Sequence, residues 1–464
     1  MASSEGALYE LIARGNKDLY FFKDDETAVS PFDNRYNPVP AQIHERRRIP
    51  PLNGSDFGRT CEFEFDVAGD LFTDPTILIE LPTWLPPTQA RQNPTSVIQD
   101  LSGIRYGYTN AIGYFLFKNI QIYQDQLLLQ EFSGDALFAA SRSRGSLNSA
   151  FLDNKITGTH TGTLLEIGRA ATPGPLRLHL PLVGCQHPDD GGFPSITTRR
   201  QTYKLRVTLR RLEELVEASD GRAYPVVWER SDFLVQTKAG AECTPFSTLK
   251  RTMIGTPSLQ LETRHIYVDP ETRDRLTRSQ IEVPFSRLYE NSFNFSAHDY
   301  APLARAAIAS ATRRVDATHP ASRMVFWFRT AQNTRANQYA IINGREYYNN
   351  VAFFIAGRDR EPLFPPLLWN QIQHLAKEER DPGPGFGLMN WELGEIRGRL
   401  PPYSHQPEGS VNFTTADRPT IYVDLADIPV DPITGQKSTE MRMVVDTWAV
   451  AAFENGRGGL KYAN

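Results

Sequence analysis

One stretch near the end of the chain, residues 407–425, reads Pro407-Glu-Gly409-Ser-Val-Asn412-Phe413-Thr-Thr-Ala-Asp417-Arg-Pro-Thr-Ile-Tyr-Val-Asp-Leu425. Pro407 and Gly409 predict a tight turn, because Pro presets φ and Gly tolerates a positive φ. Apolar and polar residues then alternate through 410–414, as in a half-buried strand. Pro419 interrupts the pattern, since Pro cannot donate to a β-ladder, and the alternation resumes at 421–425. The stretch predicts a turn and two strands of a β-sandwich, with no catalytic group.

The composition points to a large all-β protein. At 464 residues the chain is too long for one ordinary core, so two or three domains are expected. Hydrophobic residues make up 40% and charged residues 22%, as in soluble globular proteins. The 33 Pro, 32 Gly, 26 Phe and 18 Tyr favour strands joined by many loops. A net charge of −4 argues against coating nucleic acid through bulk charge.

Cysteine usage and the chain start indicate where the protein is made. Cys61, Cys185 and Cys243 are far apart and odd in number, so we expect free thiols in a reducing compartment. The first residues lack the basic and apolar regions of a signal peptide. No uncharged apolar run reaches the ~18 residues that span a bilayer. These features predict synthesis in the cytosol.

Strand patterns recur along the whole chain. By our count about eight strands precede residue 220, enough for one jelly roll. Residues 220–256 are punctuated by Gly and Pro and predict a connector, after which the alternation begins again. Short helices are expected at 131–144 and at 270–278. The two halves show no clear sequence repeat. The clearest alternating segments lie at 61–67, 77–81, 114–123, 176–182, 203–212, 259–269, 281–294, 323–333, 347–355 and 441–453.

Two segments near the N-terminus each allow two interpretations. Leu8, Leu11 and Ile12 have helical spacing and predict a short helix that ends at Gly15. This helix packs either on its own domain or, as an arm, on a neighbouring subunit. Residues 46–48 are three consecutive arginines. They belong either to a solvated, salt-bridged strand end or to a contact with DNA or an inner membrane.

No enzyme signature is present. The chain lacks a nucleophile elbow, an HExxH motif, a P-loop and an EF-hand loop. Gly383–Gly387 is interpreted as a flexible surface loop, and the carboxylates Glu392 and Glu395 have no pattern that marks a glycosidase. We therefore predict no catalytic residue, no cofactor and no metal. One group of residues comes nearest to a metal-binding pattern. Because its spacing matches no zinc pattern, we interpret it as a strand histidine followed by a polar turn. The group comprises His179, Cys185, His187, Asp189 and Asp190.

The stretch quoted first resembles a hallmark of one protein family. A Pro-x-Gly-x-x-Asn-Phe-Ser/Thr-x-x-Asp run is similar to that of the major capsid proteins of nucleocytoplasmic large DNA viruses. Glu408 and Thr415 depart from the usual small and basic residues. The start Gly6–Asp18 and the end Gly459–Asn464 also resemble the family, and similar phrases run collinearly between them. The matching positions of the hallmark are Pro407, Gly409, Asn412, Phe413 and Asp417.

The resemblance implies an all-β fold of two consecutive eight-stranded antiparallel jelly-roll β-sandwiches with short helices and long loops. We expect an N-terminal arm at 1–30, a first jelly roll at 31–220, a connector at 221–256 and a second jelly roll at 257–464. The long loops are candidates for an outward tower and for contacts between capsomers. They lie at 82–110, 145–175, 297–318, 333–350 and 377–406.

The function implied is that of a structural major capsid protein in the virion. Three copies would form a pseudo-hexagonal capsomer that tiles an icosahedral shell, assembled in the host cytoplasm. Partners would be further copies, neighbouring capsomers, minor capsid and penton proteins and an inner membrane, without sequence-specific nucleic-acid binding. Two alternatives stay open: a jelly-roll scaffold that templates a viral membrane, and a two-domain β-sandwich lectin or glycoside hydrolase.

Overall fold

The computed structural model describes most of the chain beyond residue 41. The chain divides into two compact units, Met1–Gln42 and Ile43–Asn464, and the account below concerns the second. The expected arm helix with Leu8, Leu11 and Ile12 lies outside the described residues. These are 42–65, 69–84, 97–143, 155–160, 173–186, 191–198, 200–236, 243–245, 248–301, 309–340, 346–377, 385–392 and 409–462.

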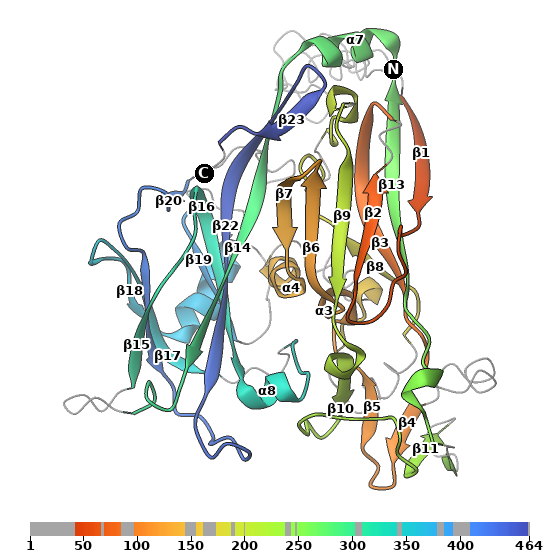
Figure 1. Cartoon of the computed structure of the whole chain (residues 1–464). Helices are drawn as coiled ribbons and strands as arrows, with labels where there is room; N and C mark the ends of the chain where they lie inside the picture. The colour runs from red at the N-terminus through yellow and green to blue at the C-terminus, as the bar shows by residue number, and fades with distance from the viewer. Residues whose placement is uncertain are drawn as a thin grey trace, which may run out of the picture. The chain divides into compact units, whose positions relative to one another are not determined.

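Eight strands of the first half form two four-stranded sheets (Figure 1). Their orders are β1-β13-β3-β8 and β2-β9-β6-β7. Apolar residues alternate along them, so that one face of each sheet is buried against the other. The strands are β1 (Gln42–Ile49), β2 (Thr60–Phe65), β3 (Leu71–Glu80), β6 (Phe117–Gln124), β7 (Leu127–Phe132), β8 (Leu176–His179), β9 (Tyr203–Leu209) and β13 (Ser258–Val268).

Eight strands of the second half form two further sheets. Their orders are β14-β22-β16-β19 and β15-β21-β17-β18, with β20 (Val411–Asn412) added to β16 and β23 (Arg457–Leu460) added to β22. The eight are β14 (Ile281–Phe295), β15 (Ser310–Arg314), β16 (Pro320–Thr330), β17 (Tyr348–Ile355), β18 (Arg358–Phe364), β19 (Phe386–Asn390), β21 (Thr420–Leu425) and β22 (Thr439–Glu454).

The two halves have the same topology. When the eight strands of each half are numbered in chain order, the sheets of both halves read 1-8-3-6 and 2-7-4-5. This is an antiparallel double-sheet arrangement of the jelly-roll type. We call β1 to β13 the first roll and β14 to β22 the second roll. The predicted fold class, two consecutive eight-stranded jelly rolls, is confirmed.

The boundary between the rolls differs from the predicted one. β13 follows the predicted connector 221–256, yet it pairs with β3 from Ser258↔Glu80 to Ile266↔Leu71 and is the eighth strand of the first roll. The segment 221–256 is therefore a connection inside that roll. Gly and Pro mark a long loop, but strand pairing is non-local, so composition does not show which sheet the next strand joins. The link between the rolls is α7 (Pro270–Arg278).

A small fifth sheet lies beyond one end of the first roll (Figure 1). It is built from the connection between β3 and β6 together with the connection between β9 and β13, in the order β10-β5-β4-β11-β12. Parts of the predicted loop 82–110 and of the predicted connector are thus paired strands. The five strands are β4 (Val97–Asp100), β5 (Arg105–Tyr108), β10 (Val216–Ala218), β11 (Phe233–Gln236) and β12 (Cys243–Pro245).

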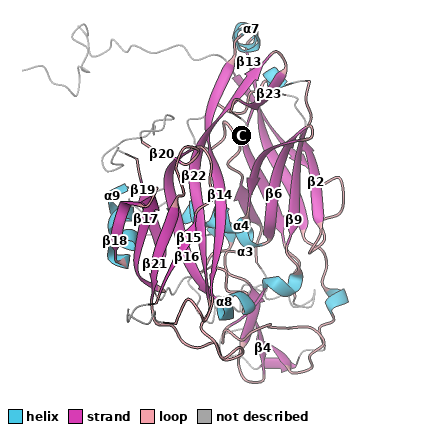
Figure 2. Ribbon diagram, turned by 60° about the vertical axis from the view of Figure 1, so that its left-hand side comes forward, coloured by secondary structure: helices cyan, strands magenta, loops and turns pink. Residues whose placement is uncertain are grey.

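The helices are short, and α4 (Gly134–Ser143) lies between the two rolls (Figure 2). The two expected helices are present as α4 and α7, and the Asp269 carboxylate caps α7 by accepting from the Thr272 amide at 3.1 Å. Arg273 of α7 binds the buried Asp70 of the first roll at 2.9 Å. The remaining bounds are α3 (Ile112–Phe115), α4 (Gly134–Ser143), α8 (Ala331–Arg335), α9 (Gln373–Lys377), the 3₁₀ turns η1 (Ser195–Thr198), η2 (Leu212–Leu215) and η3 (Arg251–Met253), and the π-helical η4 (Leu367–Ile372).

The β14-β22-β16-β19 sheet has two buried faces. Along β16, Phe326 and Phe328 belong to the core of the second roll, whereas Val325 and Trp327 belong to the core cluster of the first roll. Successive side chains of a strand point to opposite faces, so the outer face of this sheet is covered by the first roll. The two rolls therefore share a large apolar contact. Among the described residues no helix is long and apolar enough to cross a membrane.

Candidate functional site

The hallmark residues form a structural turn at the end of the second roll. Pro407 lies outside the described residues. Phe413 is 3% exposed, and its ring lies 5.9 Å from those of Phe353 and Trp391. Its amide donates to the His319 carbonyl at 3.1 Å. Phe413 therefore fastens this turn into the core of the second roll.

The polar hallmark residues shape the same turn. Asn412 ends β20, and its side-chain oxygen accepts from the Thr414 amide at 3.0 Å. Gly409 lies in the bend before β20. Asp417 is exposed, and its carbonyl accepts from the Ala356 amide at 2.7 Å. The contacts of these described residues are those of a backbone turn.

The basic cluster at 46–48 lies at the edge of the first roll and is ion-paired. Arg46 and Arg48 both contact Glu262, at 3.2 and 3.0 Å, and Arg47 contacts Glu45 at 3.1 Å. The Glu262 side chain is 8% exposed, so it needs such partners. The salt-bridged strand end is the interpretation that these contacts favour, and a contact with DNA or membrane stays a hypothesis.

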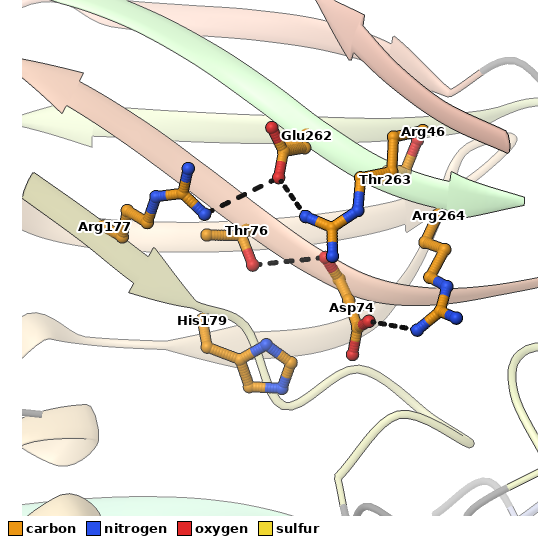
Figure 3. A pocket seen from close by; sticks show the side chains of 8 residues that line it. All are labelled: Arg46, Asp74, Thr76, Arg177, His179, Glu262, Thr263 and Arg264. Atoms are coloured by element: carbon orange, nitrogen blue, oxygen red, sulfur yellow. Dashed lines mark hydrogen bonds and ion pairs between the residues drawn. The ribbon is translucent and has the colours of Figure 1, made fainter. Parts of the chain in front are cut away.

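Beside this cluster the outer face of the β1-β13-β3-β8 sheet carries a polar pocket (Figure 3). Its volume is about 190 Å³. Arg177 lies 3.7 Å from Glu262, and Arg264 lies 3.6 Å from Asp74. Arginine and carboxylate groups therefore alternate across an open sheet face. The lining residues are Arg46, Asp74, Thr76, Arg177, His179, Glu262, Thr263 and Arg264.

Two of the residues considered for a metal, His179 and Cys185, are described, and both contact backbone carbonyls. His179 Nε2 lies 3.2 Å from the Cys185 carbonyl, and the Cys185 thiol donates to the Phe72 carbonyl. In the described part of the chain no group of three His, Cys, Asp or Glu residues is placed to hold a metal ion. The other three candidates, His187, Asp189 and Asp190, lie outside the described residues.

The structure describes part of the glycine-rich segment Gly383–Gly387 and one of the two carboxylates, Glu392 and Glu395. The prediction of a flexible surface loop over Gly383–Gly387 is wrong at its C-terminal end, because Phe386 and Gly387 are buried in β19. A Cβ on Gly387 would overlap the Phe326 ring, so the glycine permits that close approach. The Glu392 amide donates to the Asn390 side chain at 2.8 Å. Glu395 lies outside the described residues.

A buried charge cluster that the sequence did not reveal joins the two rolls. Asp135, in the first turn of α4, binds Arg329 of β16 and lies 3.0 Å from Arg210, which follows β9. Arg442 of β22 lies 4.0 Å from the same carboxylate. Asp135 and Arg329 side chains are both 2% exposed. We call Asp135, Arg210, Arg329 and Arg442 the joint cluster.

The arginines set the charge state of this carboxylate. Burial alone raises the pKa of Asp135, but Arg329, Arg442 and Arg210 outweigh it and lower the pKa to about 2. The Arg329 guanidinium also donates to the Tyr339 carbonyl at 3.1 Å. The cluster is thus ionised and hydrogen-bonded at neutral pH. No sequence pattern shows these contacts, since Asp135 and Arg329 lie almost two hundred positions apart.

A second buried carboxylate lies where the small sheet meets the second roll. The Asn110 amide donates to Glu217 of β10 at 3.1 Å. Burial raises the pKa of Glu217 to about 7, against the lowering effect of Asn110 and Gln338. Nearby, Asn337 of the second roll donates to the Val216 carbonyl at 2.6 Å. This contact ties the second roll to the small sheet.

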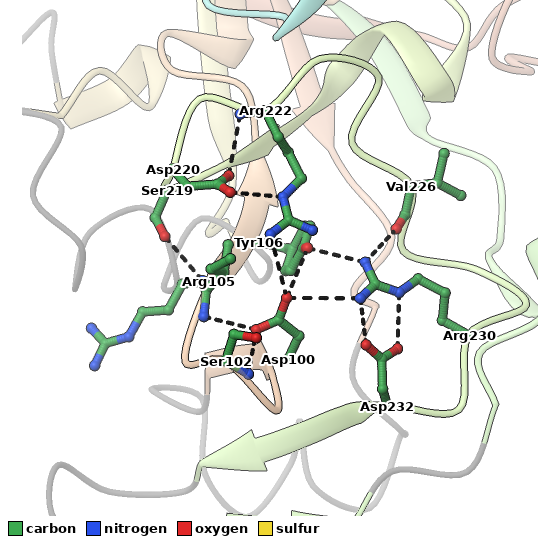
Figure 4. A network of polar contacts seen from close by, with 11 residues as sticks. Asp100, Ser102, Arg105, Tyr106, Ser219, Asp220, Arg222, Val226, Arg230 and Asp232 are labelled. Carbon is green, nitrogen blue, oxygen red and sulfur yellow. Dashed lines mark hydrogen bonds and ion pairs between the residues drawn. The ribbon is translucent and has the colours of Figure 1, made fainter.

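The small sheet has its own polar network (Figure 4). Arg230 binds Asp232 at 2.9 Å and the Tyr106 hydroxyl at 3.0 Å, and that hydroxyl donates to Asp100 at 3.2 Å. Arg222 approaches Asp100 to 3.8 Å. Asp100 also accepts from the Ser102 amide, which closes the turn between β4 and β5. The network anchors the connection after β10 to the β4–β5 hairpin.

The comparisons with known proteins establish the fold. No family model matches the chain. The major capsid protein of Chrysochromulina ericina virus is 27% identical over 108 residues, a match that spans 23% of this chain and only 17% of that protein. The match therefore covers less than a fifth of that relative's length.

Solved structures match over nearly the whole chain. PBCV-1 VP54, fitted into a reconstruction of the virophage Sputnik, is 16% identical and matches with a TM-score of 0.69 over 93% of this chain and 100% of that chain. The quasi-atomic model of the PBCV-1 capsid gives 15% identity and 0.68 over the same shares. The Faustovirus major capsid protein is 12% identical and matches with a TM-score of 0.58 over 92% of this chain and 93% of that chain. The chain has the double jelly-roll fold of these viral capsid structures.

Proposed function

We propose that this chain is a structural major capsid protein of a large DNA virus. The observation that carries the proposal is the match of both rolls, in order, to the whole of PBCV-1 VP54. The collinear hallmark residues and the partial similarity to the Chrysochromulina ericina virus protein support it independently. In this function the protein acts through its shape, as a block that packs beside identical blocks.

The proposal assigns no catalytic activity to the chain. The buried acids of the described part have structural partners: Asp135 is held by arginines, and Asp446 binds Arg323 at 2.9 Å. Removing one partner of such a buried pair is strongly destabilising, so these acids contribute to the stability of the fold. The hallmark turn contributes packing, as described above.

The assembly unit that we propose is a homotrimer. Each chain contributes two rolls of one topology, so three copies supply six similar wedges around a closed three-fold axis. The rolls that we propose as domains run from 42 to 268 and from 281 to 462. The proposed partners are neighbouring capsomers, minor capsid and penton proteins and an inner membrane, with assembly in the host cytoplasm. The proposed N-terminal arm docks on a neighbouring subunit at the inner side of the shell.

The solution mass tests this proposal. Three chains of 52.4 kDa should scatter light as a species of about 157 kDa, with a hexagonal outline in negative stain. A protein that stays at 52.4 kDa even at high concentration would refute it and would turn attention to glycan binding. Detection of the protein in purified mature particles separates a capsid protein from a scaffold that is shed.

A further inference from the structure

A polar pocket lies where the small sheet meets the second roll, at the end of the molecule that holds α8 (Figure 1). Its volume is about 390 Å³, which lies within the ~300–1,000 Å³ of small-molecule sites. Nine of its twelve lining residues have a polar side chain. We call it the α8 pocket. Most of its wall comes from three segments that are far apart in the sequence, namely 219–221 after β10, 330–338 with α8, and 429–438 between β21 and β22.

Hydrogen bonds inside the protein already orient part of this lining. The Thr330 hydroxyl accepts from the Asn333 amide at 3.1 Å, and the Asn333 side chain donates to the Gln338 side chain at 3.3 Å. Asp431 is paired with Arg335, and this pairing lowers the pKa of Asp431 to about 2. These groups are therefore held in place, and the carboxylate is charged, before a ligand arrives. A pre-organised site loses less conformational entropy on binding.

Other polar groups of the lining remain for a ligand. In the described part of the chain the side chains of Gln332 and Ser438 make no hydrogen bond; Gln332 is exposed and Ser438 is half-buried. The Ser219 hydroxyl accepts from the Arg105 amide at 3.1 Å and keeps its own proton to donate. An amide and a hydroxyl each donate and accept, so these side chains suit a ligand that does both.

The charges of the lining argue against an anionic ligand. Its acidic side chains are the carboxylates of Asp220 and Asp431, and none of the described lining residues is basic. Arg222 pairs with Asp220 at 2.8 Å, as Arg335 does with Asp431. A phosphate or a carboxylate ligand would bring like charges together, which costs affinity. A neutral hydroxyl group donates to a carboxylate without that cost, and the hydrogen bond is strengthened by the charge.

Tyr347 adds an aromatic ring to the pocket. The residue is half-buried, and its ring centroid lies 6.5 Å from that of Phe328, a core residue of the second roll. An aromatic ring has an apolar face, against which the C–H groups of a sugar ring pack, and Tyr also has a polar tip. The pocket therefore combines hydrogen-bonding groups with an apolar surface.

The backbone beside the pocket is strained. Tyr224 has a φ of 51°, in the left-handed region that a bulky side chain rarely adopts. Its amide donates at 2.8 Å to the carbonyl of Arg335, the residue that pairs with Asp431. Backbone strain of this kind is concentrated at functional sites such as ligand-binding sites. This observation is independent of the chemistry of the lining.

We propose that the α8 pocket is a binding site for a neutral carbohydrate. The hydroxyl groups of the sugar donate to Asp220 and Asp431 and exchange hydrogen bonds with Gln332 and Ser438. One face of its ring packs on Tyr347. Neighbouring hydroxyl groups of one sugar supply this combination of donors and acceptors within a single pocket. The inference goes beyond the proposed function and does not depend on it, since binding of a sugar needs neither a trimer nor a shell.

Saturation-transfer difference NMR on the full chain tests the class of ligand. The neutral probes are glucose, galactose, mannose and N-acetylglucosamine, and the anionic probes are glucuronic acid and N-acetylneuraminic acid. We expect at least one neutral sugar to receive saturation from the wild type and neither acid to do so. Absence of a signal from every neutral probe would overturn the proposal. A signal from an acid as strong as that from the best neutral probe would do the same.

A double variant tests whether the sugar binds in the α8 pocket. Gln332→Ala/Ser438→Ala removes two side chains that the proposal assigns to the ligand. The matched control is Gln436→Ala, an exposed glutamine between β21 and β22 that is outside the lining. Loss of two hydrogen bonds should weaken binding of the sugar about tenfold, and the control should bind as the wild type does. An unchanged affinity in the double variant, or an equal loss in Gln436→Ala, would overturn the assignment.

Two further measurements keep the outcomes distinct. Equal circular dichroism spectra and thermal midpoints show that the variants fold as the wild type does. If the double variant folds poorly, each single variant gives the same test with an expected loss of about threefold. The solution mass is measured separately. A trimer that binds no neutral sugar would overturn this inference and leave the proposed function standing, and a monomer that binds one would do the reverse.

Discussion

The Asp135→Asn variant tests whether charge holds the two rolls together. The substitution keeps the shape of the side chain but removes its charge from beside Arg210, Arg329 and Arg442. Arg329 then stays buried beside the Tyr339 carbonyl and three aromatic rings. The centroids of these rings lie 5.5 to 5.9 Å from its guanidinium carbon. A buried cation without its counter-charge is costly.

Two independent estimates give the size of the effect. Removing one partner of a buried ion pair costs about 3–5 kcal/mol. A carboxyl pKa lowered from 3.8 to about 2 corresponds to about 2 kcal/mol of stability at neutral pH. We therefore expect Asp135→Asn to lower the free energy of unfolding by about 2–5 kcal/mol. The matched control is Glu62→Gln, whose exposed partner Arg206 lies at 2.8 Å and which should cost under about 1 kcal/mol.

Urea unfolding at one protein concentration, followed by tryptophan fluorescence, measures both variants. Because the folded pKa of Asp135 lies below its unfolded value, its contribution is present above about pH 4 and is lost as the pH falls through about 2. The difference between wild type and Asp135→Asn should shrink over that window. A cost no larger than that of Glu62→Gln, or a difference that does not change with pH, would refute the electrostatic account of the joint.

Two further predictions concern other buried residues. Phe413→Ala should lower the free energy of unfolding by about 3–5 kcal/mol because it leaves a cavity in the core of the second roll. Asn412→Ala should lower it by about 1 kcal/mol because it removes one hydrogen bond of the turn. Equal urea midpoints for the two variants would contradict this ranking. The folded pKa of Glu217, about 7, lies above its unfolded value, so stability should fall as the pH rises from about 4.5 to 7, and Glu217→Gln should abolish that fall. An unchanged pH profile of thermal unfolding in Glu217→Gln would show that another group is responsible.

The strands that alternate strongly could be predicted from the sequence. The segment 203–212 contains β9, and the segment 441–453 lies within β22. In both, the alternation is strong because one face of the strand packs on a core and every second side chain is apolar. The alternation at 421–425 likewise located β21 (Thr420–Leu425). The strand expected through 410–414 is only the two-residue β20, and Phe413 lies in the turn that follows it.

Features that depend on distant pairing could not be predicted. β13 follows a long connection of Gly and Pro, and nothing within Ser258–Val268 states that its partner is β3 rather than β14. The joint cluster has the same origin, because Asp135 and Arg329 meet only after both rolls have formed. Gly387 was misassigned because its role is set by the Phe326 ring on the neighbouring strand.

The two rolls have identical strand orders but no visible sequence repeat, and the weak constraint that the fold places on sequence explains this difference. A jelly roll constrains only the inward positions of each strand to be apolar, and many apolar residues satisfy that constraint. The outward positions of the two rolls differ because their surroundings differ. On the 1-8-3-6 sheet of the second roll, the outward residues Val325 and Trp327 are covered by the first roll. On the 1-8-3-6 sheet of the first roll, the outward residues Arg46 and Arg177 are exposed to solvent. An apolar face suits a contact made permanently within one chain. A charged face suits a surface that stays exposed to water.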